Sequence, residues 1–140
     1  MYKIRIMDIK DYSEIINLWK NTKGVGINDY DDSKRRIKIF LEKNSQSCFV
    51  AENEQKIIGT IMGANDGRRG LIYHLMVKPE YRKKGIGKKL LDKVEKNLKK
   101  EGIRRIYLVT LKENKIGNKF WENNNYIVRD FVKLRSKIME

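Results

Sequence analysis

Hydrophobic residues change their spacing several times along the chain, and each change marks a new element. The alternation in Tyr2–Ile6 predicts a strand. Asp8 is a suitable N-cap for a helix in which apolar residues recur at helical spacing from Ile9 to Trp19. A second helix is expected from Ser33 to Lys43, with its buried face made of Ile37, Phe40 and Leu41.

Three strands should follow these helices. Ser47–Glu52 and Lys56–Asp66 read as the two arms of a hairpin, because only a short polar turn separates them. Leu71–Val77 is an almost continuous apolar run, which is typical of a strand buried at the centre of a sheet.

The second half begins with a strongly amphipathic helix after Pro79, whose apolar face consists of Ile86, Leu90, Leu91, Val94 and Leu98. Gly102 should end this helix, a strand should occupy Ile106–Leu111, and a short helix should start at Asn114. Two further segments look like closing strands, Tyr126–Val128 and Phe131–Leu134.

This order mixes hairpins with crossover helices, so we expect a mixed sheet in an α/β (α+β) sandwich. The length of 140 residues suits a single domain over residues 1–140. No apolar run approaches the ~18–20 residues that cross a bilayer, and no secretory signal is visible, so we expect a cytoplasmic protein without a membrane partner.

Composition adds one strong constraint, a formal net charge of +14. Such a charge attracts anions, so nucleic acid, an acidic substrate and a polyphosphate cofactor are all candidates beside a merely solvated surface. The chain lacks a zinc-finger, RNP-like or helix-turn-helix pattern, which makes nucleic acid an unfavoured partner. Cys48 is the only cysteine, which rules out an internal disulfide and a multi-cysteine metal site, and we expect no metal.

A candidate phosphate site lies where the buried strand runs through a short turn into the long helix. Gly85 and Gly87 lack the Cβ atoms that would keep phosphate oxygens away from the backbone of this turn. A helix N-terminus also offers unpaired N–H groups and a partial positive charge. Cations surround the same turn, namely Arg82, Lys83, Lys84 and Lys88.

Two common phosphate motifs do not fit this turn. A Walker A loop fails because Arg82 occupies its first glycine position and Lys89 occupies its Ser/Thr position. A dinucleotide fingerprint fails because Leu90 stands at its third glycine. An ordinary glycine-bearing turn into a lysine-rich helix remains open from these residues alone.

The same residues resemble the R-x-x-G-x-G pyrophosphate motif of the GNAT N-acetyltransferase superfamily, between a V-x-P-x-Y strand end and an amphipathic helix. A second family block resembles the segment with Asn114, Gly117, the pair Phe120–Trp121 and Asn125–Tyr126. The resemblance covers nearly the whole chain and is strongest to small bacterial members close to the ribosomal-protein N-terminal acetylase type.

The resemblance implies a GNAT-type fold, with a mostly antiparallel sheet, a splayed motif strand and about four flanking helices. It also implies acetyl-CoA as cosubstrate and a primary amine as acceptor, either a small molecule or a protein N-terminus, with a slight tilt to the latter. The cofactor contacts that it implies are Leu75, Met76, Val77, Arg82, Lys83, Lys84, Gly85, Ile86, Gly87, Lys88, Asn114 and Trp121.

In this family a neutral amine attacks the thioester directly, and a tyrosine often protonates the departing thiolate. Trp121 stands at that tyrosine's position, and its indole N–H is no usable acid. Tyr73, Tyr107 and Tyr126 remain possible replacements, and water is a further one. The missing tyrosine also leaves a non-catalytic acyl-CoA sensor as the alternative function.

For the base we favour His74, the only histidine, which lies in the motif strand beside Tyr73. Neighbouring strand residues point to opposite faces, so both can face the amine only if a bulge turns one of them. Other acids remain open as bases acting through water, namely Glu52, Asp66 and Glu113.

The resemblance also implies that specificity comes from two segments, Lys23–Asp32 and Arg129–Lys137. The first holds an acidic cluster that either attracts a cationic amine or caps the second helix.

Overall fold

The computed structural model describes all residues from 1 to 140, in two compact units that comprise residues 1–109 and 110–140. The first unit contains β1 (Lys3–Ile6), α1 (Tyr12–Lys20), α2 (Lys34–Lys43), β2 (Cys48–Asn53), β3 (Lys56–Asn65), β4 (Gly70–Val77), α3 (Ile86–Lys100) and β5 (Ile106–Tyr107). The second unit contains α4 (Lys115–Asn123). Short 3-10 helices cover Ile9–Asp11 and Pro79–Tyr81.

The sheet has five strands in the sequential order β1-β2-β3-β4-β5. The first four strands pair antiparallel, and β5 runs parallel to β4, as the expected mixed and mostly antiparallel sheet requires. The parallel pairing joins only Gly70 to Ile106 and Leu71 to Tyr107. From Ile72 to Val77 the second edge of β4 therefore has no neighbouring strand, which is the predicted splay of the motif strand.

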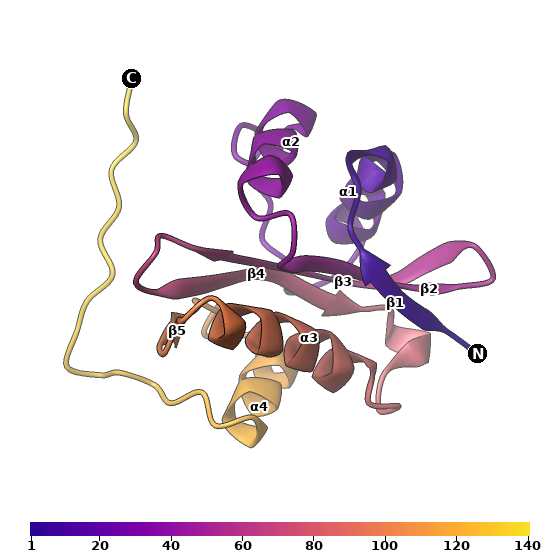
Figure 1. Ribbon diagram of the computed structural model, residues 1–140. Coiled ribbons are helices and arrows are strands. Elements are labelled where there is room, and N and C mark those ends of the chain that lie inside the picture. The colour runs from indigo at the N-terminus through magenta and orange to yellow at the C-terminus, as the bar shows by residue number, and fades with distance from the viewer. The chain divides into compact units, whose positions relative to one another are not determined.

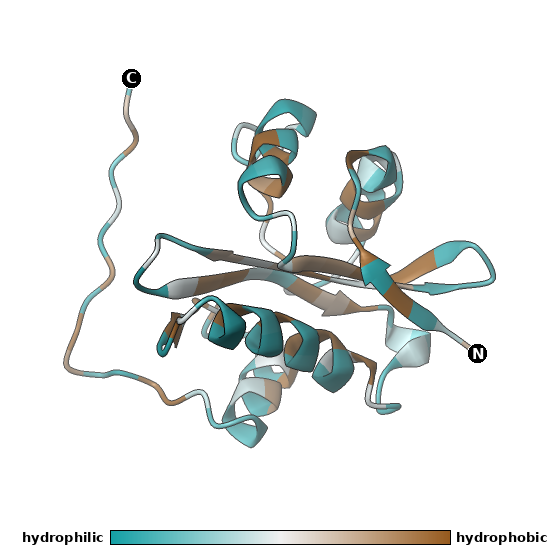
Figure 2. Ribbon diagram, viewed as in Figure 1, coloured by the Kyte–Doolittle hydropathy of each residue, from teal (hydrophilic) through white to brown (hydrophobic).

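Helices cover both faces of this sheet (Figure 1). The helices α1 and α2 lie on one face and α3 lies on the other. Their apolar stripes turn toward the strands, and their outer surfaces are mainly hydrophilic (Figure 2). The predicted apolar face of α3 is buried at all five positions, Ile86, Leu90, Leu91, Val94 and Leu98.

The helix ends follow the capping chemistry that the residues indicate. The Asp8 carboxylate accepts a hydrogen bond from the backbone N–H of Lys10, and Asp11 accepts one from the backbone N–H of Asp8 at 2.9 Å. Ser33 caps α2 by accepting a bond from the N–H of Arg36. Gly102 ends α3 with a φ of +86°, a conformation that glycine adopts without steric cost.

The C-terminal third departs from the sequence-based expectation. The predicted strand Ile106–Leu111 is only two residues long, and the predicted closing strands Tyr126–Val128 and Phe131–Leu134 do not form. Apolar residues in those two segments are exposed, among them Val128 and Phe131. A strand needs a partner for its backbone groups, and an apolar pattern alone does not supply one.

Residues 110–140 contain one regular element, α4. The side chain of Asn114 caps it by accepting a hydrogen bond from the N–H of Gly117 at 3.0 Å. The Trp121 ring meets Phe120 and Tyr126 edge to face, with centroids 5.1 and 4.9 Å apart. That residues 1–140 act as a single domain stays a prediction. None of the helices has the length and apolar character needed to span a membrane.

Gly63 provides a test of how tightly α3 packs on β3. A Cβ atom at this position would lie 2.6 Å from Cγ1 of Val94 and 2.9 Å from the carbonyl oxygen of Ser47. We expect Gly63→Ala to lower the free energy of unfolding by about 1–3 kcal/mol, because both neighbours belong to buried, well-packed segments. Urea unfolding followed by circular dichroism measures the change.

The matched control is Gly26→Ala, because a Cβ atom there meets no atom within 4 Å. Equal unfolding midpoints for the two variants would show that β3 and α3 are packed more loosely than the structure indicates.

Candidate functional site

A β-bulge in β4 dominates the geometry of the site. Thr60 pairs with Met76 and Met62 pairs with Tyr73, so His74 and Leu75 both stand opposite a single residue of β3. His74 adopts a φ of +50°, in the left-handed region that is uncommon for residues with a side chain. The bulge interrupts the strand alternation, and Tyr73 and His74 line the same cavity as a result.

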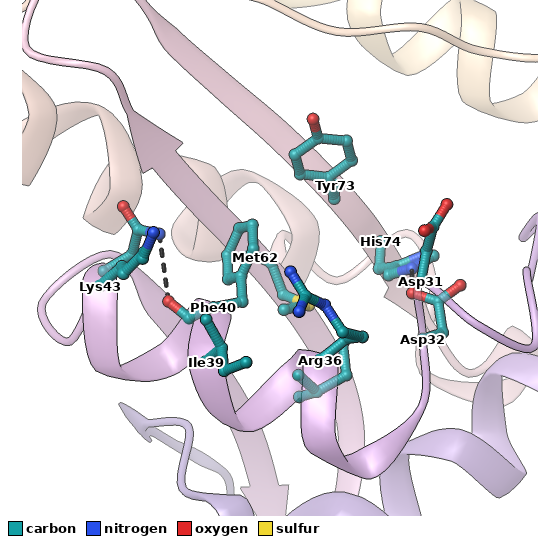
Figure 3. Close-up of a pocket in the computed structure, with 11 residues that line it drawn as sticks. Asp31, Asp32, Arg36, Ile39, Phe40, Lys43, Met62, Tyr73 and His74 are labelled. Atoms are coloured by element: carbon teal, nitrogen blue, oxygen red, sulfur yellow. Dashed lines mark hydrogen bonds and ion pairs between the residues drawn. The ribbon is translucent and has the colours of Figure 1, made fainter. Parts of the chain in front are cut away.

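This cavity has a volume of about 350 Å³ and lies between α2 and the bulge (Figure 3). Its walls come from β3, β4, the helix α2 with the residue that follows it, and the loop that precedes α2. The residues labelled in the view are Asp31, Asp32, Arg36, Ile39, Phe40, Lys43, Met62, Tyr73 and His74. Tyr73 is 41% exposed and meets the Phe40 ring edge to face at 5.8 Å.

His74 forms a hydrogen-bonded pair with Asp32. The distance between Nε2 of His74 and Oδ1 of Asp32 is 2.8 Å, and Oδ2 of Asp32 accepts a bond from the N–H of Asn28 at 2.9 Å. Burial alone would raise the pKa of Asp32, but the bonds from His74 and Asn28 outweigh it and leave that pKa below its ordinary value of 3.8. Asp32 is therefore ionised at neutral pH and can only accept, so Nε2 of His74 carries the proton of this bond and Nδ1 is the ring nitrogen that Asp32 does not engage.

A buried network holds the bulge from behind. The His74 ring stacks on the ring of Trp19 with centroids 4.1 Å apart. Nε1 of Trp19 donates to Oγ1 of Thr60 at 3.0 Å, and that hydroxyl donates to the carbonyl oxygen of His74 at 2.8 Å. Trp19 and Thr60 are fully buried, so these contacts fix both the backbone and the ring of His74.

Two of the other candidate bases are engaged elsewhere and do not line the cavity. Glu52 pairs with Arg5 at 3.0 Å, and this contact holds the pKa of Glu52 below its usual value. Asp66 accepts bonds from the N–H groups of Arg69 and Arg68 in the β3–β4 turn, which lower its pKa in the same way. The third, Glu113, belongs to the second unit.

The only cysteine has no nucleophilic role in this arrangement. Cys48 is 1% exposed, and burial raises the pKa of its thiol to about 12. A thiol that stays protonated and inaccessible cannot accept an acyl group. No three histidine, cysteine, aspartate or glutamate side chains gather as metal ligands would.

The loop before α3 has the features of a phosphate site. Gly85 is the N-cap of α3, has a φ of +82°, and is not assisted by any capping side chain. A Cβ atom at Gly85 would point into open space, with no protein atom within 4 Å. No acidic side chain occupies the first turn of α3, so its N–H groups and helix dipole are available to an anion. The arrangement fits a pyrophosphate group.

The cations around this loop differ in their surroundings. Nε of Arg82 donates to the carbonyl oxygen of Val77 at 3.0 Å and so lies over the end of β4. Lys83 has a φ of +62°, and the ammonium group of Lys84 lies 5.5 Å from the centre of the Tyr81 ring. Lys88 pairs with Asp92, which raises the pKa of Lys88. We therefore expect Lys88 to attract phosphate less strongly than the free lysines.

The remaining predicted cofactor contacts divide between the two units. Leu75, Met76 and Val77 form the end of β4, along the edge that no strand occupies, although the Met76 side chain is buried. Ile86 begins α3 with a buried side chain, so it can offer a phosphate only its backbone. Asn114 and Trp121 belong to the second unit, and their contact with the cofactor stays a prediction.

Several residues of the site carry no signal in the sequence. Asp32 was expected only as part of an acidic loop, and its pairing with His74 over 42 positions depends on how the loop folds back onto the bulge. Trp19 and Thr60 read as ordinary helix and strand residues. Only the bulge brings these three residues to one histidine.

Comparison with known proteins identifies relatives over nearly the whole chain. The acetyltransferase (GNAT) family matches residues 12–126. An acetyltransferase of Sodalis glossinidius (strain morsitans) is 32% identical over 135 residues, which make up 96% of this chain and 94% of that protein.

Two solved structures extend the likeness to three dimensions. The PaiA N-acetyltransferase of Thermoplasma acidophilum, in complex with coenzyme A, has a TM-score of 0.78 and 27% identity, and the match covers 93% of this chain and 92% of that one. A predicted acetyltransferase of Clostridium acetobutylicum, with acetyl-CoA, has a TM-score of 0.78 and 23% identity over 96% of both chains. The second comparison shows likeness of fold alone.

The Asp32–His74 pair predicts a pH-dependent contribution to stability. Because its pKa is lowered in the folded state, Asp32 stabilises the fold above its ordinary value of 3.8 and loses this effect as the pH falls through its folded pKa. We expect Asp32→Asn to lower the free energy of unfolding by about 1–3 kcal/mol at pH 7, because a buried charged hydrogen bond is lost. The difference from the wild type should shrink as the pH falls below 3.8.

Urea unfolding at a series of pH values measures this difference. Asp31→Asn is the control, because the neighbouring Asp31 is exposed and its side chain has no partner. A loss in Asp32→Asn that is the same at every pH would contradict the ionised pair.

Proposed function

Because the chain belongs to the GNAT family of acetyltransferases, we propose that it transfers an acetyl group from acetyl-CoA to a primary amine held in the cavity beside the β4 bulge. The observation that carries the proposal is His74, the cavity's only histidine, held in one orientation by Asp32 and Trp19. The cofactor would lie along the open edge of β4, with its pyrophosphate at the loop before α3.

Acetyl-CoA chemistry suits the free edge and the uncapped helix. The backbone of Leu75–Val77 can pair with an extended, amide-containing chain such as pantetheine, because no strand occupies that edge beyond Leu71. The uncapped start of α3 at Gly85 can hold the pyrophosphate through backbone N–H groups. In this proposal a backbone N–H group near the bulge polarises the thioester carbonyl, as an oxyanion donor does.

The transfer is a direct substitution at the thioester. Nδ1 of His74 takes a proton from the ammonium group, and the amine lone pair attacks the carbonyl carbon. The C–N bond forms, the C–S bond breaks, CoA leaves as a thiolate, and the nitrogen gives its second proton to water as the neutral amide forms. The ionised Asp32 stabilises the imidazolium that has gained the proton, because its carboxylate lies 2.8 Å from Nε2.

Protonation of the thiolate is a separate step. Tyr73 is the proposed acid, because its ring lines the same cavity and its phenol is partly exposed. Of the alternatives, Tyr107 faces the guanidinium group of Arg69 at 5.2 Å, and Tyr126 belongs to the second unit. A thiol with an ordinary pKa near ~8.5 can also leave with a proton from water.

Membership of the family does not define the acceptor. A protein or peptide N-terminus remains our preferred acceptor among primary amines, because the cavity opens to solvent between α2 and β4 and its rim residues Asp31 and Lys43 are exposed. The charges on the cavity wall narrow this class further, as described below.

Gly85→Asp tests the phosphate loop. The carboxylate would project into the open space where the pyrophosphate is expected, so we expect acetyl-CoA and CoA to lose their stabilising effect in thermal-shift experiments. A ligand at about 100 times its Kd adds roughly 2.7 kcal/mol to the wild-type stability, which is readily measured. NAD and ATP at matched concentration and salt should give no comparable shift.

Gly102→Asp is the matched control. Gly102 also has a positive φ and open space around it, but it lies at the opposite end of α3. Backbone strain is therefore similar in both variants, and only Gly85→Asp should lose the cofactor. Equal shifts with all four ligands would mean that the net charge of +14 binds anions without discrimination.

His74→Ala and His74→Gln test the base. We expect kcat with an accepted amine to fall by roughly 10²–10⁴-fold in both variants, while the affinity for acetyl-CoA stays close to that of the wild type. His74→Gln keeps a hydrogen-bond donor for Asp32 and therefore controls for loss of stability in the alanine variant. Initial rates between pH 6 and pH 9, with thermal melting as the folding check, measure the effect.

Wild-type rates in both variants across this pH range would remove His74 from the mechanism. A wild-type protein that binds acetyl-CoA but acetylates none of a broad panel of amines would instead support the alternative, a non-catalytic acyl-CoA sensor, which the tryptophan at position 121 makes worth testing.

A further inference from the structure

The cavity is lined by two carboxylates and two cations, and the cations have no ion-pair partner. Asp32 is committed to His74, which leaves Asp31 as the only unengaged carboxylate on the wall. Arg36 and Lys43 provide two cations, and neither forms an ion pair within the chain. An amine by itself needs only negative charge in the cavity, whereas this wall also presents two cations without ion-pair partners.

Of the two cations, Arg36 is the more informative. Its side chain is partly buried, and its guanidinium group lies 5.9 Å from the centre of the Tyr30 ring without a carboxylate partner. Partial burial of an unpaired cation costs free energy, and an anionic partner offsets this cost. A guanidinium group recognises a carboxylate through two parallel hydrogen bonds.

Both cations, Arg36 and Lys43, lie on the face of α2 that lines the cavity. Arg36, Phe40 and Lys43 are spaced i, i+4 and i+7, which places them on one face of a helix. Figure 3 shows Arg36 close to Asp32 and His74, and Lys43 further along the helix. The other cations of α2 are exposed and do not line the cavity, namely Lys34, Arg35 and Lys38.

We propose that the acceptor carries a carboxylate as well as the reacting amine, and that Arg36 binds this carboxylate while the amine lies between Asp31 and His74. The proposal rests on the acetyl transfer proposed above and names its substrate class, a free amino acid or an acidic peptide N-terminus. Lys43 extends the positive wall toward solvent, where a longer peptide would leave the cavity.

The same charges disfavour a different class of acceptor. Polycationic amines such as spermidine or neamine would bring several positive groups against Arg36 and Lys43, with only one unengaged carboxylate to receive them. Like charges at close range are repulsive by the same physical rule that attracts the carboxylate. Specificity would therefore come from both an attractive and a repulsive element of one wall.

Matched pairs of acceptors test the proposal directly. We would measure kcat/KM for phenylalanine against phenylalaninamide, for an alanyl-glutamyl peptide amide against its alanyl-glutaminyl counterpart, and for spermidine and neamine. The carboxylate member of at least one pair should be preferred roughly 10- to 100-fold, as expected for a charged hydrogen-bonded contact. The amino-acid pair and the peptide pair distinguish the two sources of the carboxylate.

Variants of α2 then test whether Arg36 causes the preference for the carboxylate acceptor. Arg36→Ala should raise KM for the carboxylate member, leave kcat and the KM for acetyl-CoA nearly unchanged, and reduce the preference to within about two-fold. Arg36→Glu should reverse the preference, and Lys38→Ala, an exposed change on another face of α2, should have no effect. A retained preference in Arg36→Ala, or a wild-type enzyme that prefers amides or polycations, would overturn the proposal.

A binding measurement separates this proposal from the proposed function. The N-acetylated products of each pair are titrated calorimetrically into the protein with CoA present. If no amine is acetylated, the proposed function fails, but tighter binding of the carboxylate products that is lost in Arg36→Ala still supports the anion subsite. Equal binding of carboxylate and amide products to the wild type would overturn the subsite whether or not turnover is observed.

Discussion

The geometry of the candidate site depends on one extra residue in β4. Without the bulge, Tyr73 and His74 would point to opposite faces of the sheet, and only one of them would reach the cavity. The bulge places both on the same side, at the cost of a left-handed backbone conformation at His74. Such a conformation persists only where its surroundings hold it, and here the Thr60 hydroxyl and the Trp19 ring do so from within the core.

The same distortion connects the cavity with the expected cofactor path. A strand that diverges from β5 after Leu71 and then bulges at His74 has an edge free to pair with an extended ligand, and its far end leads into the glycine turn before α3. The acyl donor and the amine can therefore approach the bulge from different sides. Direct transfer between two bound substrates needs this arrangement, and the buried Cys48 offers no covalent alternative.

The charged residues of this protein have different roles, which its net charge does not reveal. Most of the 32 lysines and arginines belong to solvated surfaces, such as the outer side of α3. A few act locally: the cations beside the uncapped start of α3 suit a pyrophosphate, and Arg36 on α2 suits a carboxylate. Asp32 differs from these cations in its use, because its carboxylate orients the imidazole of His74 rather than attracting an amine.

The sequence by itself determined the elements that local patterns specify, including the buried face of α3, the hairpin of β2 and β3, and the glycine turn at Gly85. Those features depend on residues close together in the chain, so spacing and capping chemistry are sufficient to predict them, and the family follows from the same motifs. Tertiary structure alone decided whether the C-terminal apolar segments found strand partners, and it decided the surroundings of His74. Asp32, Trp19 and Thr60 contact that histidine or its backbone from three distant segments. The bulge depends on the long-range pairing of β3 with β4, so the spacing of neighbouring residues could not predict it.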